Sequence, residues 1–151
     1  MVSNIPPGFR ALPLPIAQLS LAAVLKCGQS FRWIALPFSD GAGSDTSLNI
    51  EYRLALKECV ICLRQSPDTL FFRAVFPDTS STPLTRVFDC DTEKARDAET
   101  LGWLKDYFQL EVDLIALYNQ WSELDPVFGK LRSRFAGIRM LRQDPWENLV
   151  S

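Results

Sequence analysis

The residues Lys26-Cys27-Gly28-Gln29-Ser30-Phe31-Arg32-Trp33 join a glycine turn to an alternating aromatic run. Gly28 has no Cβ, so it can adopt a positive φ and allow another group to approach its backbone closely. On a strand, Phe31 and Trp33 would point to one face and Arg32 to the other. Two interpretations fit this pattern: a hairpin entry whose aromatic side chains fill a core, or a loop that presents the Gly28 backbone to a flat ligand. Periodicity does not decide between them.

Two blocks of sequence carry a resemblance to a known family. The first block is Leu25 to Trp33. The second comprises Trp103-Leu104-Lys105-Asp106-Tyr107-Phe108-Gln109-Leu110, then Leu117-Tyr118 with Trp121, then Gly137-Ile138-Arg139-Met140-Leu141-Arg142-Gln143-Asp144-Pro145-Trp146-Glu147. In their order and approximate spacing these blocks resemble the eukaryotic 8-oxoguanine DNA glycosylase/AP lyase, over about residues 9–38 and 100–151. The resemblance implies an α+β fold, with an antiparallel, TATA-binding-protein-like sheet followed by helices and truncated before the helix-hairpin-helix catalytic core.

The resemblance also implies a role for the glycine loop. It implies that the Gly28 backbone carbonyl contacts the flipped base, and we interpret the five residues after it as the support that fixes the loop: Gln29, Ser30, Phe31, Arg32 and Trp33. In 8-oxoguanine N7 carries a hydrogen where guanine has an acceptor, so a carbonyl would bind the first base and repel the second. A buried polar mismatch of this kind costs about 1–3 kcal/mol. Cys27 stands where small polar residues also occur in the family, which has no consequence for the carbonyl.

No catalytic residue is assigned in this chain. The family resemblance implies a Schiff-base lysine and a nearby aspartate, in a region beyond Ser151. The five lysines of the sequence do not match the catalytic motif, and neither do its aspartates; the lysines are Lys26, Lys57, Lys94, Lys105 and Lys130.

Composition excludes several other kinds of site. The chain has 151 residues, of which 47% are hydrophobic, which suits one domain with an ample core. It contains no histidine, which excludes histidine-dependent triads and most zinc sites. Cys59 and Cys62 have the spacing of metal ligands, but they lie in an apolar strand, where residues three apart face opposite sides. We therefore expect no metal and no cofactor.

Charge is distributed unevenly along the chain. Residues 89–125 carry ten acidic and three basic side chains, whereas residues 126–142 carry no acid and five basic ones: Lys130, Arg132, Arg134, Arg139 and Arg142. The basic stretch fits either a solvated helix face or a contact with DNA phosphates. No apolar run approaches 18 residues and no signal peptide is recognisable, so we expect an intracellular, reduced protein without a membrane span. The resemblance implies a monomer that works in the nucleus, with the mitochondrion as a second location. Its implied partner is double-stranded DNA containing 8-oxoguanine.

The order of elements predicts strands first and helices afterwards. We expect an extended, proline-rich lead-in over 1–15, an N-terminal α+β domain over 16–110, and the first helices of a helical domain, truncated, over 111–151. Within these ranges the pattern predicts a short strand passing into a helical turn over 16–25, and strands over 30–36, Ile50–Leu56, Glu58–Arg64 and Thr69–Phe76. Loops are predicted over 37–49 and 78–83. Three helices follow: one from about Asp91 to Phe108, one capped by Asp113, and one opened by Asp125-Pro126 and ended by Gly137.

The last residues predict an incomplete element. Gln143–Ser151 contains a further Asp-Pro start, but only seven residues follow from Pro145, too few for an isolated helix. We expect this end to be frayed and the chain to stop inside an element. The predicted function is the N-terminal portion of a base-excision-repair glycosylase/lyase that recognises and excises 8-oxoguanine. The alternative is a non-catalytic truncated isoform or binding module derived from that family.

Overall fold

The fold is a five-stranded antiparallel sheet followed by helices, as the sequence predicted. It is seen in a computed structural model that describes residues 5–38, 50–77 and 90–150. The sheet has the order β1-β5-β4-β3-β2. Its strands are β1 (Arg10–Pro13), β2 (Ile34–Pro37), β3 (Ile50–Leu56), β4 (Cys59–Gln65) and β5 (Thr69–Val75). The loops predicted over 37–49 and 78–83 lie outside the described residues, apart from Pro37 and Phe38.

The three central strands were correctly predicted from alternation and turn residues. β3 pairs with β4 so that Tyr52 lies opposite Leu63, and β4 pairs with β5 so that Leu63 lies opposite Phe72. Tyr52, Leu63 and Phe72 are all buried in the main core. A register shift of one residue would turn this whole set away from the core, so burial fixes the pairing.

The N-terminal third of the chain departs from the prediction. Residues 10–13, expected only as part of an extended lead-in, form strand β1, which pairs with β5 at the edge of the sheet. An edge position tolerates Pro13, since one side of the strand needs no ladder hydrogen bond. Residues 16–25 contain no strand; turns lead into the short helix α1 (Leu21–Val24), which the Ser20 side chain caps. β2 starts only at Ile34, so residues 30–33 approach the sheet as irregular chain.

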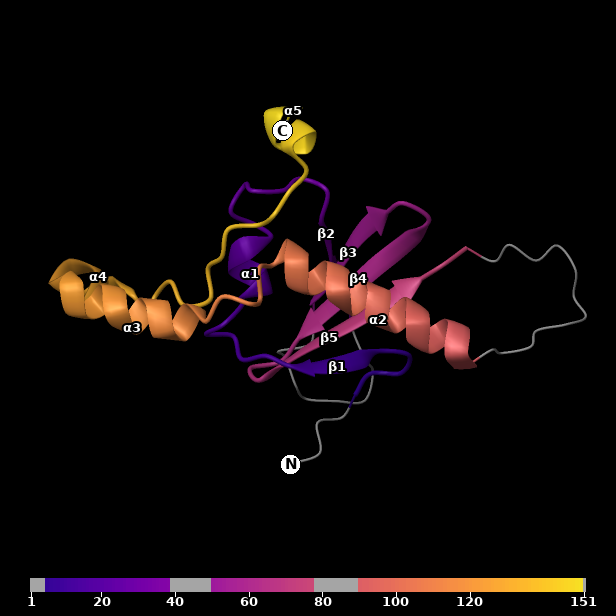
Figure 1. Cartoon of the computed structure of the whole chain (residues 1–151), viewed down its shortest axis with the longest axis horizontal. Helices are drawn as coiled ribbons and strands as arrows, with labels where there is room; N and C mark the ends of the chain where they lie inside the picture. Colours follow the sequence, from indigo (N-terminus) through magenta and orange to yellow (C-terminus); the bar gives the residue numbers. More distant parts are fainter. Residues whose placement is uncertain (1–4, 39–49, 78–89, 151) are drawn as a thin grey trace, which may run out of the picture.

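Helix α2 (Cys90–Tyr107) lies across one face of the sheet (Figure 1). Its Leu104, with the following Phe108, is fully buried in the main core against strand residues such as Leu54 and Leu63. This confirms the helix predicted from the apolar spacing of Leu101, Leu104 and Phe108, although Leu101 is only partly buried. Leu19 and Leu21, from the turn before α1 and from α1 itself, complete the same core from beside the end of α2.

The remaining helices are α3 (Leu114–Leu124), α4 (Pro126–Leu131) and α5 (Pro145–Val150). In Figure 1 α3 and α4 lie together at one end of the molecule, whereas α5 stands apart from them at the C-terminus. The predicted caps are confirmed. The Asp113 side chain accepts from Ala116 N–H at the start of α3, and the Asp125 side chain accepts from Val127 N–H at the start of α4, whose first residue is Pro126.

The sequence pattern also predicts Val127, Leu131 and Phe135 as the buried line of α4, and this prediction is wrong. Helix α4 ends at Leu131 rather than at Gly137. Val127, Leu131 and Phe135 are all exposed; Phe128 instead packs against α3, with its ring edge-on to Trp121 at 5.6 Å between centroids. A helical period identifies apolar stripes, but it does not say which stripe faces a neighbour.

The sheet face opposite α2 contains a buried ion-pair network that the sequence did not indicate. The Glu51 carboxylate is 1% exposed and accepts from Arg64 at 2.7 Å and from Arg53 at 2.6 Å. The Arg64 guanidinium also lies over the Phe9 ring at 4.8 Å. Burial raises the pKa of Glu51, but the hydrogen bonds from Arg64 and Arg53 outweigh it and hold that pKa below its usual 4.5.

This network should stabilise the fold in a pH-dependent manner. Glu51→Gln is expected to lower the free energy of unfolding by about 3 kcal/mol at pH 7, because it leaves buried cationic charge without its carboxylate. A lowered pKa gives stability that is present above pH 4.5 and lost as the pH falls through the folded-state value. The difference between parent and variant in urea unfolding should therefore shrink in acid.

The matched control is Glu93→Gln, since Glu93 also pairs with an arginine, Arg10, but on the surface. It should change stability little. Equal effects of the two substitutions, or a Glu51→Gln deficit that grows in acid, would contradict this interpretation.

Candidate functional site

The Gly28 loop presents open backbone to its surroundings. Gly28 has φ +84, is exposed, and has no atom within 4 Å of the place where a Cβ would lie. Positive φ is a conformation that glycine adopts without strain, which explains the residue type. The structure thus agrees with a positive-φ loop that leaves the Gly28 backbone accessible.

The Gln29 side chain ties this loop to a distant part of the chain. Its Nε2 donates to the Arg139 carbonyl oxygen at 2.8 Å, and its Oε1 accepts from Leu141 N–H at 3.0 Å. Nε2 also lies 3.2 Å from the Cys27 sulfur. One amide therefore bridges the two sequence blocks on which the resemblance rests.

Trp33 makes the second link, through aromatic and polar contacts. Its Nε1 donates to the Tyr107 hydroxyl at 3.1 Å in the buried core. The Tyr107 ring stacks on Trp103 at 4.7 Å, and the Tyr107 carbonyl oxygen accepts from Arg142 N–H at 2.8 Å. The end of α2 therefore contacts both the glycine loop and the segment that follows Gly137.

The other predicted support residues are placed differently. Phe31 is 72% exposed whereas Trp33 is buried, so the two do not share a face as the strand pattern predicted. The reason is that regular strand geometry begins only at Ile34. Arg32 donates from Nη2 to the Ala55 carbonyl oxygen at 2.8 Å. Ser30 is buried, and its hydroxyl has no hydrogen-bond partner among the described residues.

Arg139 holds the neighbouring segments together, a role that the sequence did not reveal. Its guanidinium is buried and donates to the Gln18 carbonyl oxygen, to the Gln109 carbonyl oxygen at 2.8 Å and to the Val112 carbonyl oxygen at 2.8 Å. It also donates to Gln18 Oε1 at 2.7 Å. Burial lowers the pKa of Arg139, although an arginine remains charged at any physiological pH.

Charge alone could not distinguish Arg139 from the other basic residues of 126–142. Arg142 is exposed and pairs with Asp106 at 3.2 Å, and Arg132 donates to the Ser122 hydroxyl at 3.2 Å. Lys130 and Arg134 are exposed and stand available to solvent or to phosphate. A contact between DNA and these two side chains stays a prediction.

Gly137 allows the close approach on which this arrangement depends. It has φ +76, and a Cβ built on it would lie 2.0 Å from the Ile16 carbonyl oxygen and 2.7 Å from Ser20 N. Its own carbonyl oxygen accepts from Ser20 N–H at 2.9 Å. Only glycine fits here, because both the conformation and the space exclude a side chain.

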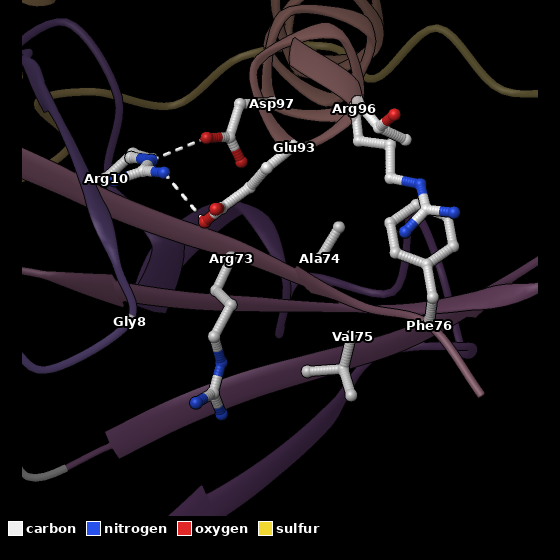
Figure 2. Close-up of a pocket in the computed structure, with 10 residues that line it drawn as sticks. Gly8, Arg10, Arg73, Ala74, Val75, Phe76, Glu93, Arg96 and Asp97 are labelled. Atoms are coloured by element: carbon white, nitrogen blue, oxygen red, sulfur yellow. Dashed lines mark hydrogen bonds and ion pairs between the residues drawn. The ribbon is translucent and has the colours of Figure 1, made fainter. Parts of the chain in front are cut away.

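Two cavities lie near these elements. One of about 130 Å³ lies beside the glycine loop; its lining includes Arg32, Trp103, Tyr107 and Arg142. A larger one of about 600 Å³ lies between β5 and the start of α2, away from Gly28. At its edge Arg10 pairs with Asp97 at 2.5 Å and with Glu93 at 2.9 Å. Figure 2 shows both carboxylates turned toward the Arg10 side chain.

The two cysteines of β4 lie on opposite faces of the sheet, as the strand pattern predicted. Cys59 packs against the main core and Cys62 lies in a separate cluster with Phe9 and Phe71, so the two thiols face opposite sides of β4. The described residues hold no group of three metal-ligating side chains. Within that same part of the chain, none of the helices has the length and apolar character needed to cross a bilayer.

The sheet, the helix across it and the open glycine loop together define an α+β domain that presents one backbone segment outward. Residues 11–149 match the family described as 8-oxoguanine DNA glycosylase, N-terminal domain. The chain belongs to this family.

The chain spans about a third of the length of the curated relatives that it matches. It is 34% identical over 144 residues to an N-glycosylase/DNA lyase of Saccharomyces cerevisiae and 29% identical to the N-glycosylase/DNA lyase OGG1 of Arabidopsis thaliana. Each match covers 95% of this chain but only about a third of the relative, 33% and 32%. A solved structure, MBOgg1 in complex with a low-affinity DNA ligand, matches with TM-score 0.57 and 26% identity, over 95% of this chain and 38% of that one.

The tight contact at Gly137 generates a prediction about stability. Gly137→Ala should lower the free energy of unfolding by about 3 kcal/mol or more, because the added Cβ meets backbone atoms and the φ is unfavourable for alanine. Gly102→Ala is the control. Gly102 lies in α2 with nothing within 4 Å of a Cβ, so alanine should raise the free energy of unfolding by about 0.5–1 kcal/mol. Chemical denaturation of both variants measures the contrast, and a Gly137→Ala protein as stable as the parent would refute it.

Proposed function

We propose that this domain supplies base recognition to a DNA glycosylase/AP lyase that excises 8-oxoguanine from double-stranded DNA. Membership of the family supports the proposal, and the observation that carries it is the accessible backbone of Gly28. Because the chain spans about a third of its relatives, the activity is proposed for a polypeptide that joins this domain to the family's catalytic region. Such an enzyme would act on DNA in the nucleus, with the mitochondrion as a second location.

The recognition step follows from hydrogen-bond chemistry. A base flipped out of the duplex exposes its N7 edge to a protein pocket. The Gly28 carbonyl oxygen is an acceptor, so it would pair with the N7–H of 8-oxoguanine and face the N7 lone pair of guanine. Burying that mismatched pair costs about 1–3 kcal/mol, which is roughly 5- to 150-fold in selectivity.

The open space around Gly28 is what such a contact requires. The loop reaches outward with nothing within 4 Å of a Cβ position, so a planar ligand can approach the backbone. Gln29 and Trp33 meanwhile connect the loop to the segment 139–141 and to Tyr107. A carbonyl that discriminates by one hydrogen must be held in place, because a misplaced acceptor loses the directional bond.

Gly28→Val tests the proposal. The branched side chain should block the approach of the flipped base, so 8-oxoguanine excision should fall by roughly 10- to 100-fold. Cleavage of an already abasic site needs no base in the pocket and should be much less affected. Both rates and the melting temperature are measured on the same variant, in a polypeptide that carries this domain and the catalytic region.

Gly8→Val is the matched control, since Gly8 has φ +74 and only ordinary contacts of 3.6 and 3.7 Å with Arg73 at a Cβ position. Both substitutions carry similar backbone strain, but Gly8 lies in the turn before β1. Equal loss of both activities in Gly28→Val together with a large drop in melting temperature would favour a purely structural glycine and sink the proposal. Equal loss of excision in Gly8→Val would do the same.

A further inference from the structure

Two glutamine side chains in this domain make the same pair of backbone hydrogen bonds. Gln65 donates from Nε2 to the Leu19 carbonyl oxygen at 2.6 Å and accepts at Oε1 from Leu21 N–H at 2.9 Å. Gln29 does the same with Arg139 and Leu141, at 2.8 and 3.0 Å. In each case one side-chain amide donates to the carbonyl of one residue and accepts from the N–H of the residue two further on. We call this pair of hydrogen bonds a clamp.

The two clamps differ in what stands beside them. Gln65 closes the end of β4 against the start of α1, inside the frame of the domain. Gln29 directly follows Gly28, and the Gly28 carbonyl belongs to the peptide plane that joins the two residues. Holding the Gln29 side chain at both polar atoms therefore limits where that carbonyl can point.

We infer that Gln29 is a positioning residue, which fixes the Gly28 carbonyl relative to the 139–141 backbone so that it can meet the N7 edge of a flipped base. This inference rests on the proposed function of Gly28. It assigns the specificity of the site to a contact between distant parts of the chain, because Gln29 and Arg139 are 110 residues apart in sequence.

The segment that Gln29 grips is itself firmly held. Arg139 donates to backbone carbonyls of Gln18, Gln109 and Val112. Leu141 is buried in the main core, and the next residue, Arg142, donates its N–H to the Tyr107 carbonyl oxygen at 2.8 Å. A clamp onto a fixed segment transmits position, whereas a clamp onto a mobile one would not.

Gln109 reinforces the same segment from the other side. It has φ +51, a strained conformation for a residue with a side chain, where α2 ends. Its Nε2 donates to the Met140 carbonyl oxygen at 3.0 Å, between the two atoms that Gln29 grips. The consecutive residues 139, 140 and 141 are thus all fixed by glutamine amides.

The test compares Gln29→Met with Gln65→Met in a polypeptide that joins this domain to the catalytic region. Methionine keeps most of the side-chain volume and removes both strong hydrogen bonds, so the two variants should lose comparable melting temperature. Gln29→Met should lower 8-oxoguanine excision by roughly 10- to 100-fold relative to abasic-site cleavage, because a carbonyl displaced by about 1 Å loses its geometry. Gln65→Met should leave that ratio unchanged.

Gln29→Glu provides a second variant if Gln29→Met does not fold. Its carboxylate can still accept from Leu141 N–H but cannot donate to the Arg139 carbonyl oxygen, so it should show the same selective loss in milder form. A parallel fall of both activities in the Gln29 variants, or an unchanged ratio of excision to abasic-site cleavage, overturns the inference.

Gly28→Val measured alongside separates this inference from the proposal beneath it. If Gly28→Val lowers excision selectively and Gln29→Met does not, recognition by Gly28 stands and positioning by Gln29 falls. If Gly28→Val leaves excision intact, the proposed function fails and the positioning role fails with it.

Discussion

A single buried guanidinium connects the parts of this domain that are furthest apart in sequence. Arg139 donates to the backbone carbonyls of Gln18, Gln109 and Val112, so it ties the turn before α1 and the turn after α2 to the segment 137–142. Each hydrogen bond to a charged donor contributes about 1.5–3 kcal/mol, and breaking a buried set leaves several polar groups unpaired. The glycine loop, the end of α2 and the C-terminal segment take their relative positions from this residue.

That constraint gives the Gly28 loop a defined place on an otherwise ordinary sheet. Gly137 lets the chain pass within contact of Ile16 and Ser20, and Gln29 then connects the loop to the segment so positioned. The glycine loop thus lies where three stretches of chain meet. The sheet supplies the core, and we propose that the exposed backbone at Gly28 supplies base recognition.

The sequence predicted those features that depend on local pattern. β3, β4 and β5 alternate and are joined by short turns, and Asp113 and Asp125 cap their helices as their positions indicate. Pattern failed where long-range pairing decides: residues 10–13, within the proline-rich lead-in, form an edge strand only because β5 is present to pair with them. Arg139 resembled the other four basic residues of 126–142, because the three carbonyl oxygens that it binds belong to residues distant in sequence. Gln29 was singled out through resemblance, but its partners 110 residues away could not be inferred from its neighbours.

Hydrogen exchange on this chain tests most directly whether segment 137–142 is an integral part of the domain. The amides of Ser20, Leu141 and Arg142 donate to Gly137, Gln29 and Tyr107 respectively, whereas Leu149 lies in a short helix with its side chain 75% exposed. We predict that the first three amides open with free energies similar to that of Leu63 in the central strand, while the Leu149 amide exchanges rapidly. If Ser20, Leu141 and Arg142 exchange as fast as Leu149 while Leu63 stays protected, the segment is not held as described, and the account is contradicted.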